Sequence, residues 1–156
     1  MCQLLASALN CRVPENKSPY TDVSPEAWYS PAVTALSNLG LVTGTGDGSF
    51  RPEDTIDHQQ FITIMGRLAQ RLNMHLYNTA QEAPDGSYNV VGLMHYADWS
   101  KASAWLMSYS QKGYLGNTIT LLWADAGEIA PTAATTRDEA AYTLYRLLSY
   151  VDILPA

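Results

Sequence analysis

The feature that most constrains this sequence is an internal repeat. One copy opens with Tyr20-Thr21-Asp22-Val23 and the other with Tyr96-Ala97-Asp98-Trp99. Each opening is followed by an apolar pattern of helical spacing that ends at a glycine, Gly40 in the first copy and Gly113 in the second. The apolar positions of these two short helices are Ala32, Val33, Leu36 and Leu39, and then Trp105, Leu106 and Tyr109.

A loop and a second helix complete each copy. The first loop is glycine-rich and runs from Gly44 to Pro52, whereas the second is longer and less regular, from Gly116 to Pro131. The helix starts that follow, Asp57 with Gln60 and Thr136 with Glu139, have the spacing of capping boxes. The stripes predicting these helices are Phe61, Ile64, Met65, Leu68 and Leu72, and then Ala140, Ala141, Leu144, Leu147, Leu148 and Val151.

The beginning of the chain fits the second-helix pattern as well. Leu4, Leu5, Ala8 and Leu9 repeat its spacing when Met1 is aligned with Phe61. We therefore expect a mostly α fold in which the three second helices form a bundle. The predicted segments are a closing helix of a truncated repeat at 1–12, a repeat at 20–72, a linker or short hairpin at 73–95, and a divergent repeat at 96–151.

Charge and composition exclude several functions. The net charge is −6, which argues against a protein that neutralises the phosphates of duplex nucleic acid. Any anion site must therefore be local, made of one or two arginines and backbone amides. No apolar run reaches the ~20 residues of a membrane span. We also expect no metal site, no cofactor and no catalytic residues, because the histidines lack metal-ligand spacing and no catalytic motif occurs.

Together these motifs resemble S-layer homology repeats. The resemblance rests on the aspartate-hydrophobe opening, the Gly-Leu-Val helix end, the Gly-Asp-Gly-Ser-Phe-Arg-Pro loop and a Thr-Arg-x-Glu helix start. It is strongest in 20–72 and continues through 96–151. It implies tandem repeats around a central helical bundle of pseudo-threefold symmetry, with short helices and glycine-rich loops as prongs. It also implies a non-catalytic module that binds anionic, pyruvylated secondary cell wall polysaccharide.

The family's best-known ligand residue is the arginine of its Thr-Arg-Ala-Glu motif, which falls on Arg137 in this chain. A helix N-terminus favours anions, and the arginine fork matches a carboxylate. In the middle repeat His58 takes the place of that arginine. Histidine is mostly uncharged at neutral pH, so we expect His58 to face a groove between repeats as a weaker anion partner.

The other candidate ligand residues each have a structural alternative. Thr136 and Glu139 form a helix cap, with ligand contact as a second role. The glycine-rich loop either cradles an anion or sugar with its amides or forms a tight turn in which Phe50 fills the core. Its candidate ligand residues are Gly46, Asp47, Gly48 and Arg51.

Two residues near the opening of the first repeat complete the set. Trp28 either stacks on a sugar ring or, with Tyr29, staples the short helix onto the core. We expect Asp22 to act as a local cap or turn former before the Ser24-Pro25 helix start.

A rival hypothesis takes the repeats as degenerate. In that case they form a structural or protein–protein interaction module without glycan binding, and other surface-layer subunits are the partners. His58 and the stretched loop 116–125 favour this hypothesis, whereas Arg137 and the intact loop 46–52 favour glycan binding. Both place the protein outside the cell, at the wall or S-layer of a bacterium. Because the sequence starts without a signal peptide, we expect a fragment or a mature form.

Overall fold

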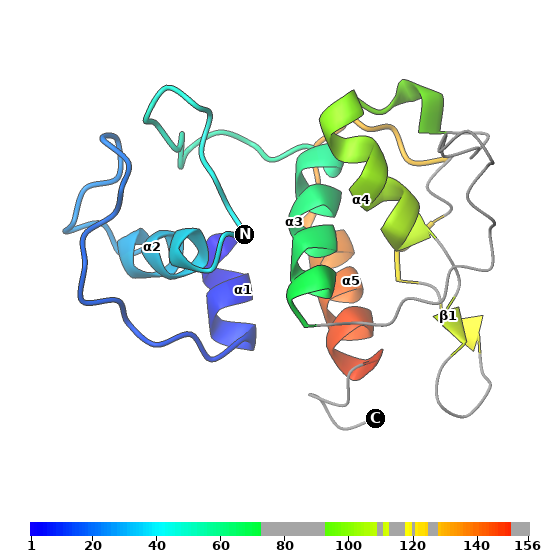
Figure 1. Cartoon of the computed structure of the whole chain (residues 1–156), viewed down its shortest axis with the longest axis horizontal. Coiled ribbons are helices and arrows are strands. Elements are labelled where there is room, and N and C mark those ends of the chain that lie inside the picture. The colour runs from blue at the N-terminus through cyan, green and yellow to red at the C-terminus, as the bar shows by residue number, and fades with distance from the viewer. Residues whose placement is uncertain (73–92, 109–110, 113–117, 120, 125–127, 151–156) are drawn as a thin grey trace. The chain divides into compact units, whose positions relative to one another are not determined.

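The computed structural model describes residues 1–72, 93–108, 111–112, 118–119, 121–124 and 128–150. These residues are mostly helical, as predicted, and their contacts divide the chain into unit 1, residues 1–55, and unit 2, residues 56–156 (Figure 1). The division falls inside the predicted repeat 20–72, so its short helix belongs to unit 1 and its second helix to unit 2. No helix in the described ranges is long and apolar enough to cross a membrane.

Unit 1 is built on two helices, α1 (Cys2–Ala8) and α2 (Ser30–Asn38), which pack against each other. The predicted glycine end of α2 is confirmed. Gly40 has φ +69°, its N–H donates to the carbonyl oxygen of Ser37 at 2.8 Å, and Leu41 donates to Leu36 at 2.9 Å. These bonds satisfy two carbonyls that a helix end leaves without partners. The core of unit 1 comprises Leu5, Ala6, Val23, Ala32, Val33, Ala35, Leu36, Leu41 and Val42.

The predicted stripe of α1 is only partly buried. Leu5 is fully buried, but Leu4 is 42% exposed, and Ala6, which lies outside the predicted stripe, is buried instead. Cys2 and Cys11 are both free. Burial raises the pKa of both thiols.

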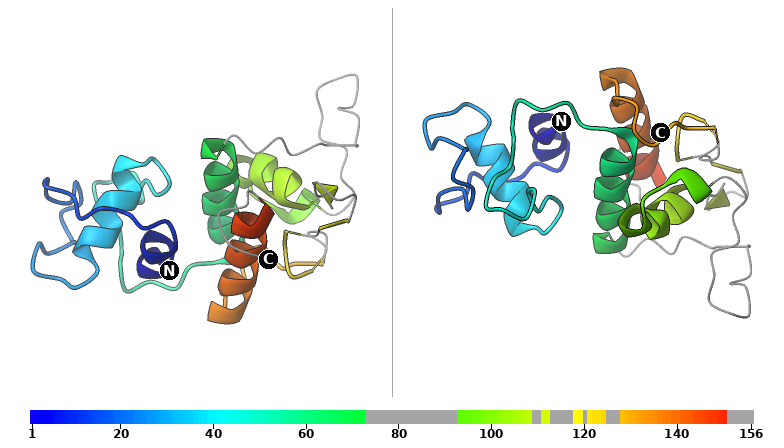
Figure 2. Two further views of the ribbon diagram at one scale, coloured as in Figure 1. Left: turned by 90° about the horizontal axis from the view of Figure 1, so that it is seen from below. Right: turned by 90° about the horizontal axis from the view of Figure 1, so that it is seen from above.

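Unit 2 contains α3 (His58–Arg71), the short 3-10 helix η1 (Leu93–His95), α4 (Asp98–Ser108) and α5 (Arg137–Tyr150). A small antiparallel pair, β1 (Gln111–Lys112) and β2 (Thr118–Ile119), adds the strands. The three long helices gather in one cluster in which α3 contacts both α4 and α5 (Figure 2). Most of the predicted linker 73–95 and the end of the predicted stripe at Val151 lie outside the described residues.

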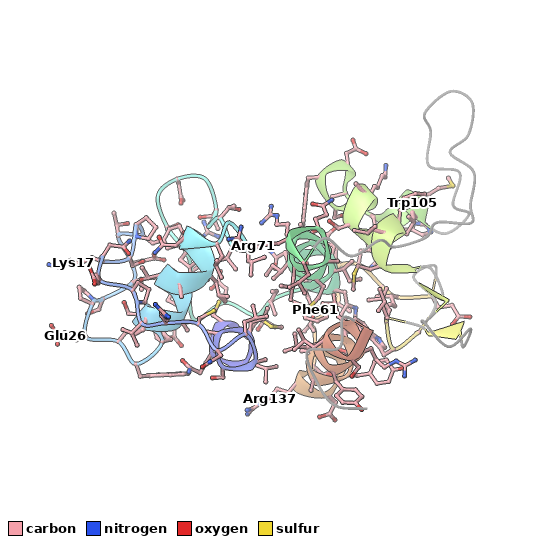
Figure 3. The ribbon with its side chains drawn as sticks, turned by 60° about the horizontal axis from the view of Figure 1, so that its bottom comes forward. Lys17, Glu26, Phe61, Arg71, Trp105 and Arg137 are labelled. Atoms are coloured by element: carbon pink, nitrogen blue, oxygen red, sulfur yellow. The ribbon has the colours of Figure 1, made fainter. Side chains whose placement is uncertain are left out.

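Helix α3 is buried on more sides than its stripe predicted. Phe61, Met65 and Leu68 are buried as expected, and Phe61 lies between α3 and α5 in Figure 3. Ile64 and Leu72 are only half-buried. Six residues outside the stripe are buried as well, namely His58, Gln59, Ile62, Thr63, Gly66 and Ala69. A stripe marks one covered face, whereas α3 is covered by two helices.

The outer helices also depart from their predicted stripes. In α4 the buried positions are Ser100, Ala104 and Met107, while the predicted Trp105 and Leu106 are half-buried. Small residues allow α4 to approach α3 closely. The predicted stripe contained only large residues, so it did not include these small buried ones. In α5 the predicted Ala140, Leu144, Leu147 and Leu148 are buried, but Ala141 is exposed.

The closest approach of α3 and α4 is at Gly66. A Cβ atom there would lie 2.6 Å from Oγ and 2.7 Å from Cβ of Ser103. Helix propensity alone would make Gly66→Ala stabilising by about 1 kcal/mol. Because the added methyl group overpacks the contact, we expect instead a net loss of about 1–2 kcal/mol in the free energy of unfolding.

Urea denaturation measures this loss, and the double variant with Ser103→Gly should recover most of it because the clashing atoms are gone. A single variant Gly66→Ala as stable as the parent would show that the helices can separate without cost.

Candidate functional site

The two helix starts of unit 2 are the places where predicted ligand residues gather. At the start of α5, the N–H of Thr136 donates to Oε2 of Glu139 at 2.7 Å, and the N–H of Glu139 donates to Oγ1 of Thr136 at 3.3 Å. This reciprocal pair is the predicted capping box, so the structural role of both residues is confirmed.

Arg137 is the first residue of α5 and is exposed. Figure 3 shows its side chain extending away from the helix. Among the residues that the structure describes, neither the guanidinium nor the N–H groups of Arg137 and Asp138 has a hydrogen-bond partner. The start of α5 therefore presents a cation and two free amide donors to solvent, and these are the groups that bind an anion at a helix N-terminus.

The start of α3 differs because its donors are already used. The N–H of His58 donates to the carbonyl of Ala133 and the N–H of Gln59 to that of Pro131, both at 2.9 Å. The capping box predicted for Asp57 and Gln60 is confirmed, with bonds of 2.8 Å and 3.0 Å. Carbonyl groups of the segment before α5 thus accept the hydrogen bonds that a bound anion would otherwise accept.

His58 points inward and does not contact solvent as an anion partner would. It is 7% exposed. Its Nδ1 lies 2.8 Å from the carbonyl oxygen of Ala130 and its Nε2 lies 3.2 Å from Oε2 of Glu139. The ring also packs on Trp123 with centroids 5.1 Å apart. The expectation of a groove-facing His58 is therefore corrected: the residue joins α3 to α5 and to the segment before it.

Gln59, the next residue, joins α3 to α4. Its Oε1 accepts the N–H of Ala97 at 3.2 Å and the hydroxyl of Ser100 at 3.5 Å, both at the start of α4. Its Nε2 donates to Asp57 at 3.3 Å. His58 and Gln59 together connect the beginnings of all three long helices of unit 2.

Glu139 takes part both in the cap of α5 and in the contact with His58. Burial is the largest single effect on its pKa and raises it, but the hydrogen bonds from Thr136 and from His58 together bring the pKa below its ordinary value. The carboxylate is therefore ionised at neutral pH, next to the free amides of Arg137 and Asp138.

The glycine-rich loop in unit 1 is closed by its own hydrogen bonds. Asp47 accepts the hydroxyl of Thr45 at 2.7 Å and the N–H of Ser49 at 2.9 Å, as well as the hydroxyl of Ser49. These bonds, with the Ser49 hydroxyl first, hold the pKa of Asp47 well below its ordinary value. Gly44 is required because a Cβ there would lie 2.5 Å from the Ser49 carbonyl oxygen and 2.6 Å from the ring of Tyr20. The predicted tight turn is thus confirmed.

Asp22 clamps this loop from a distance along the chain. Its carboxylate accepts the N–H of Phe50 at 2.8 Å and that of Arg51 at 2.7 Å. The bond from Phe50, and then that from Arg51, lower the pKa of Asp22. The clamp holds Arg51 at φ +57°, which is uncommon for a residue with a side chain. The expectation that Asp22 is a local cap is wrong, because its partners lie in the far loop.

Two aromatic predictions are also corrected. Phe50 is only half-buried and packs on Tyr20 with centroids 5.1 Å apart, so it does not fill the core. Trp28 is 75% exposed and contacts Tyr29 edge to face, so it does not staple α2 onto the core. Its ring remains available to a sugar or a protein partner.

The structure brings together the predicted site residues His58, Thr136, Arg137 and Glu139, all within unit 2. The others, Trp28, Gly46, Asp47, Gly48 and Arg51, lie in unit 1. Sequence reasoning missed Gln59, Ala130 and Trp123. The apolar run Leu121-Leu122-Trp123 was the available signal, since Leu121 and Leu122 are buried despite lying in a predicted loop. No group of three or more histidine, cysteine or acidic residues in the described ranges is placed to hold a metal ion.

Comparison with known families identifies part of this chain. Residues 19–62, from the Asp22 clamp to the first turns of α3, match the S-layer homology domain. The match is confined to this segment, and there it confirms the resemblance predicted from the sequence. S-layer homology domains are non-catalytic cell-wall anchoring modules of surface proteins.

Two curated proteins are similar to the chain. It is 23% identical over 148 residues to an endoglucanase of Bacillus sp. (strain KSM-635), an alignment that covers 95% of this chain and 14% of that protein. It is 31% identical over 51 residues to cell surface glycoprotein 1 of Acetivibrio thermocellus, covering 33% of this chain and 2% of that protein. The chain therefore spans only a small part of each relative's length.

The Asp22 clamp makes a prediction about the S-layer homology segment. In Asp22→Ala the amides of Phe50 and Arg51 lose their acceptor, so we expect their hydrogen exchange to be accelerated about tenfold or more. Because the folded-state pKa of Asp22 is lowered, the parent keeps this protection at neutral pH and loses it as the pH falls through that pKa.

Amide exchange followed by NMR gives the rates, and Asp54→Ala, which removes another exposed aspartate after the same loop, is the matched control. Equal protection of the two amides in Asp22→Ala and in the control would contradict the clamp.

Proposed function

We propose that this chain binds an anionic secondary cell wall polysaccharide through the start of α5, with Arg137 as the principal contact. The observation that carries the proposal is the set of unpartnered donors at this helix start. The Arg137 guanidinium and the amides of Arg137 and Asp138 lack acceptors among the described residues. A carboxylate such as that of a pyruvate ketal supplies acceptors of matching geometry.

Electrostatics supports a local anion site despite the net charge of −6. Helix α5 has 14 residues, so the partial positive charge at its N-terminus is fully developed. Arg137 adds a full charge at the same place. The negative charges of Asp138 and Glu139 oppose the positive charge of Arg137. Without the arginine this helix start would therefore not attract an anion.

The start of α3 is a poor ligand site by the same reasoning. Its first amides are bonded to Pro131 and Ala133, and its His58 side chain is buried. A ligand there would have to displace intramolecular bonds before forming its own. We therefore place a single anion site of this type in unit 2.

The wider arrangement is part of the same proposal. We propose tandem S-layer homology repeats at 20–72 and 96–151, preceded by the closing helix of another repeat, around a pseudo-threefold bundle. In support, α1 packs on α2 just as α3 packs on α4, so the closing helix of one repeat twice contacts the opening helix of the next. The proposed location is the outer face of a bacterial cell wall, with no catalytic role for this module.

Loop residues of unit 1 form a second set of proposed contacts. Trp28 offers an exposed ring, and Arg51 is held by the clamp with its side chain exposed. Its guanidinium is 4.0 Å from Asp47, an exposed pair that contributes little and leaves the arginine able to contact a ligand. Gly46 and Gly48 are exposed beside it.

A second candidate function is protein–protein interaction within a surface layer. The observation that favours it is the exposure of large apolar side chains, 75% for Trp28, 83% for Met94 and 56% for Trp99. Single exposed apolar residues are common on monomeric proteins, so this observation is weaker than the free helix start.

The test of glycan binding compares two arginines of unit 2. Arg137→Ala should weaken binding of a pyruvylated wall polysaccharide fragment by about 10- to 100-fold, because a hydrogen bond to a charged group is lost. Arg71→Ala, which removes an exposed arginine near the other end of α3, should bind within about twofold of the parent. Isothermal titration calorimetry measures both.

Thermal melts of the two variants check that they remain folded, since the Thr136–Glu139 cap is untouched. If folded Arg137→Ala binds as tightly as Arg71→Ala, the start of α5 is not the ligand site. Absence of binding by the parent, with self-association in ultracentrifugation, would establish the second candidate instead.

A further inference from the structure

A cavity of about 150 Å³ lies in unit 1, between the end of α1 and the beginning of α2. It is separate from the glycine-rich loop, which follows the other end of α2, and it includes no residue of unit 2. An engineered protein cavity of about the same volume takes up benzene, so a space of this size has room for one six-membered ring. The cavity therefore suits a single small ring and is too small for a folded partner.

The floor of the cavity is formed by three alanines. Ala6 of α1 and Ala32 and Ala35 of α2 line it, and none of them is more than 8% exposed. Because their side chains end at Cβ, the two packed helices leave a space that larger side chains would fill. This floor offers apolar surface and no side-chain hydrogen-bonding group.

The end of α1 brings polar side chains to the same cavity. Asn10 has φ +48°, its N–H donates to the carbonyl oxygen of Ser7 at 3.1 Å, and the N–H of Cys11 donates to that of Ala6 at 2.9 Å. This pair of bonds ends the helix in a left-handed residue, a position that asparagine accepts more readily than most residues. Arg12 follows directly and lines the cavity with Asn10 and Cys11.

The polar side chains around the cavity include one cation. Arg12 supplies a guanidinium and Asn10 an amide, while Gln3 donates to the hydroxyl of Ser7 at 3.3 Å. Within the described ranges, neither the Arg12 nor the Asn10 side chain has a hydrogen bond or an ion pair. No acidic residue is among the described residues that line the cavity, so its formal charge is positive.

These features select a class of ligand. A carboxylate matches the fork of the guanidinium. Hydroxyl groups both donate and accept, as the Asn10 amide does. Apolar C–H groups of a ring match the alanine floor. A neutral sugar would leave Arg12 without a partner, and a simple carboxylic acid would leave the floor and Asn10 uncovered, whereas an acidic sugar satisfies all three.

We propose that the cavity between α1 and α2 binds one acidic sugar residue of a glycan. Arg12 holds the carboxylate, Asn10 bonds to ring hydroxyl groups, and the alanines support the apolar face of the ring. This site goes beyond the function proposed for the start of α5. It shares no residue with that helix start, so the two proposals can be tested separately.

Glucuronate, glucose and acetate are the probes. Glucuronate and glucose have the same ring and differ in the carboxylate, whereas acetate carries the carboxylate without the ring. Amide shifts of the whole chain, followed by NMR at constant ionic strength, measure each affinity. We expect glucuronate to shift the amides of Ser7, Asn10 and Ala32, and to bind about tenfold more tightly than glucose or acetate.

Three variants assign the contacts. Arg12→Gln removes the cation, and Lys17→Gln removes another exposed cation of unit 1 as the matched control (Figure 3). Asn10→Gly removes the amide and keeps the left-handed backbone, which glycine adopts freely. Arg12→Gln should weaken glucuronate binding about tenfold and leave glucose binding unchanged. Asn10→Gly should weaken the binding of both sugars, and Lys17→Gln should bind like the parent.

Cys11 provides a second readout, because its half-buried thiol lines the cavity. In a Cys2→Ala background it is the remaining cysteine of the chain. Saturating glucuronate should slow the alkylation of Cys11 by iodoacetamide several-fold, since a bound ring covers the thiol. The same concentration of acetate should leave the rate unchanged.

The outcomes separate the site from its ligand class. Absence of shifts at the cavity amides, or equal glucuronate affinity of Arg12→Gln and Lys17→Gln, would overturn the site. Acetate binding as tightly as glucuronate would overturn the sugar. Loss of polysaccharide binding in Arg137→Ala concerns the start of α5, whereas glucuronate shifts in unit 1 concern this cavity, so failure of one proposal leaves the other standing.

Discussion

The first turn of an α-helix leaves backbone N–H groups without acceptors inside the helix, and the fate of these groups distinguishes the two helix starts of unit 2. In α3 they are bonded to the carbonyls of Pro131 and Ala133 and to Asp57. In α5 the capping box of Thr136 and Glu139 pairs only the N–H groups of these two residues. The two helix starts have similar sequence patterns, but the first amides of α3 are bonded within the chain whereas those of Arg137 and Asp138 have no acceptor among the described residues.

Sequence predicted the features whose partners lie close along the chain. Both capping boxes span three residues, and the Gly40 helix end depends on its immediate neighbours. Other contacts span much more of the chain. Asp22 meets Phe50 across 28 residues and His58 meets Glu139 across 81 residues, and nothing in the local pattern specifies such pairings.

The apolar stripes predicted burial best for helices that are covered on one side only. The stripe of α5 matched its buried face except that Ala141 is exposed and that Thr143, outside the stripe, is buried. For α3 the stripe found Phe61, Met65 and Leu68 but not Ile62, Thr63 or Gly66, and Gly66 lies against Ser103 of α4. Close helix packing selects small residues, and these carry little hydrophobic signal. Periodicity alone therefore under-reports the burial of a central helix.

His58 stands at the position of α3 that corresponds to Arg137 in α5, and its ring lies between the carbonyl oxygen of Ala130 and the carboxylate of Glu139. Histidine fits, packs on Trp123 and adds a bond to Glu139. The start of α3 is thereby linked to the start of α5, because the Glu139 carboxylate that meets His58 also accepts the N–H of Thr136, the residue before Arg137.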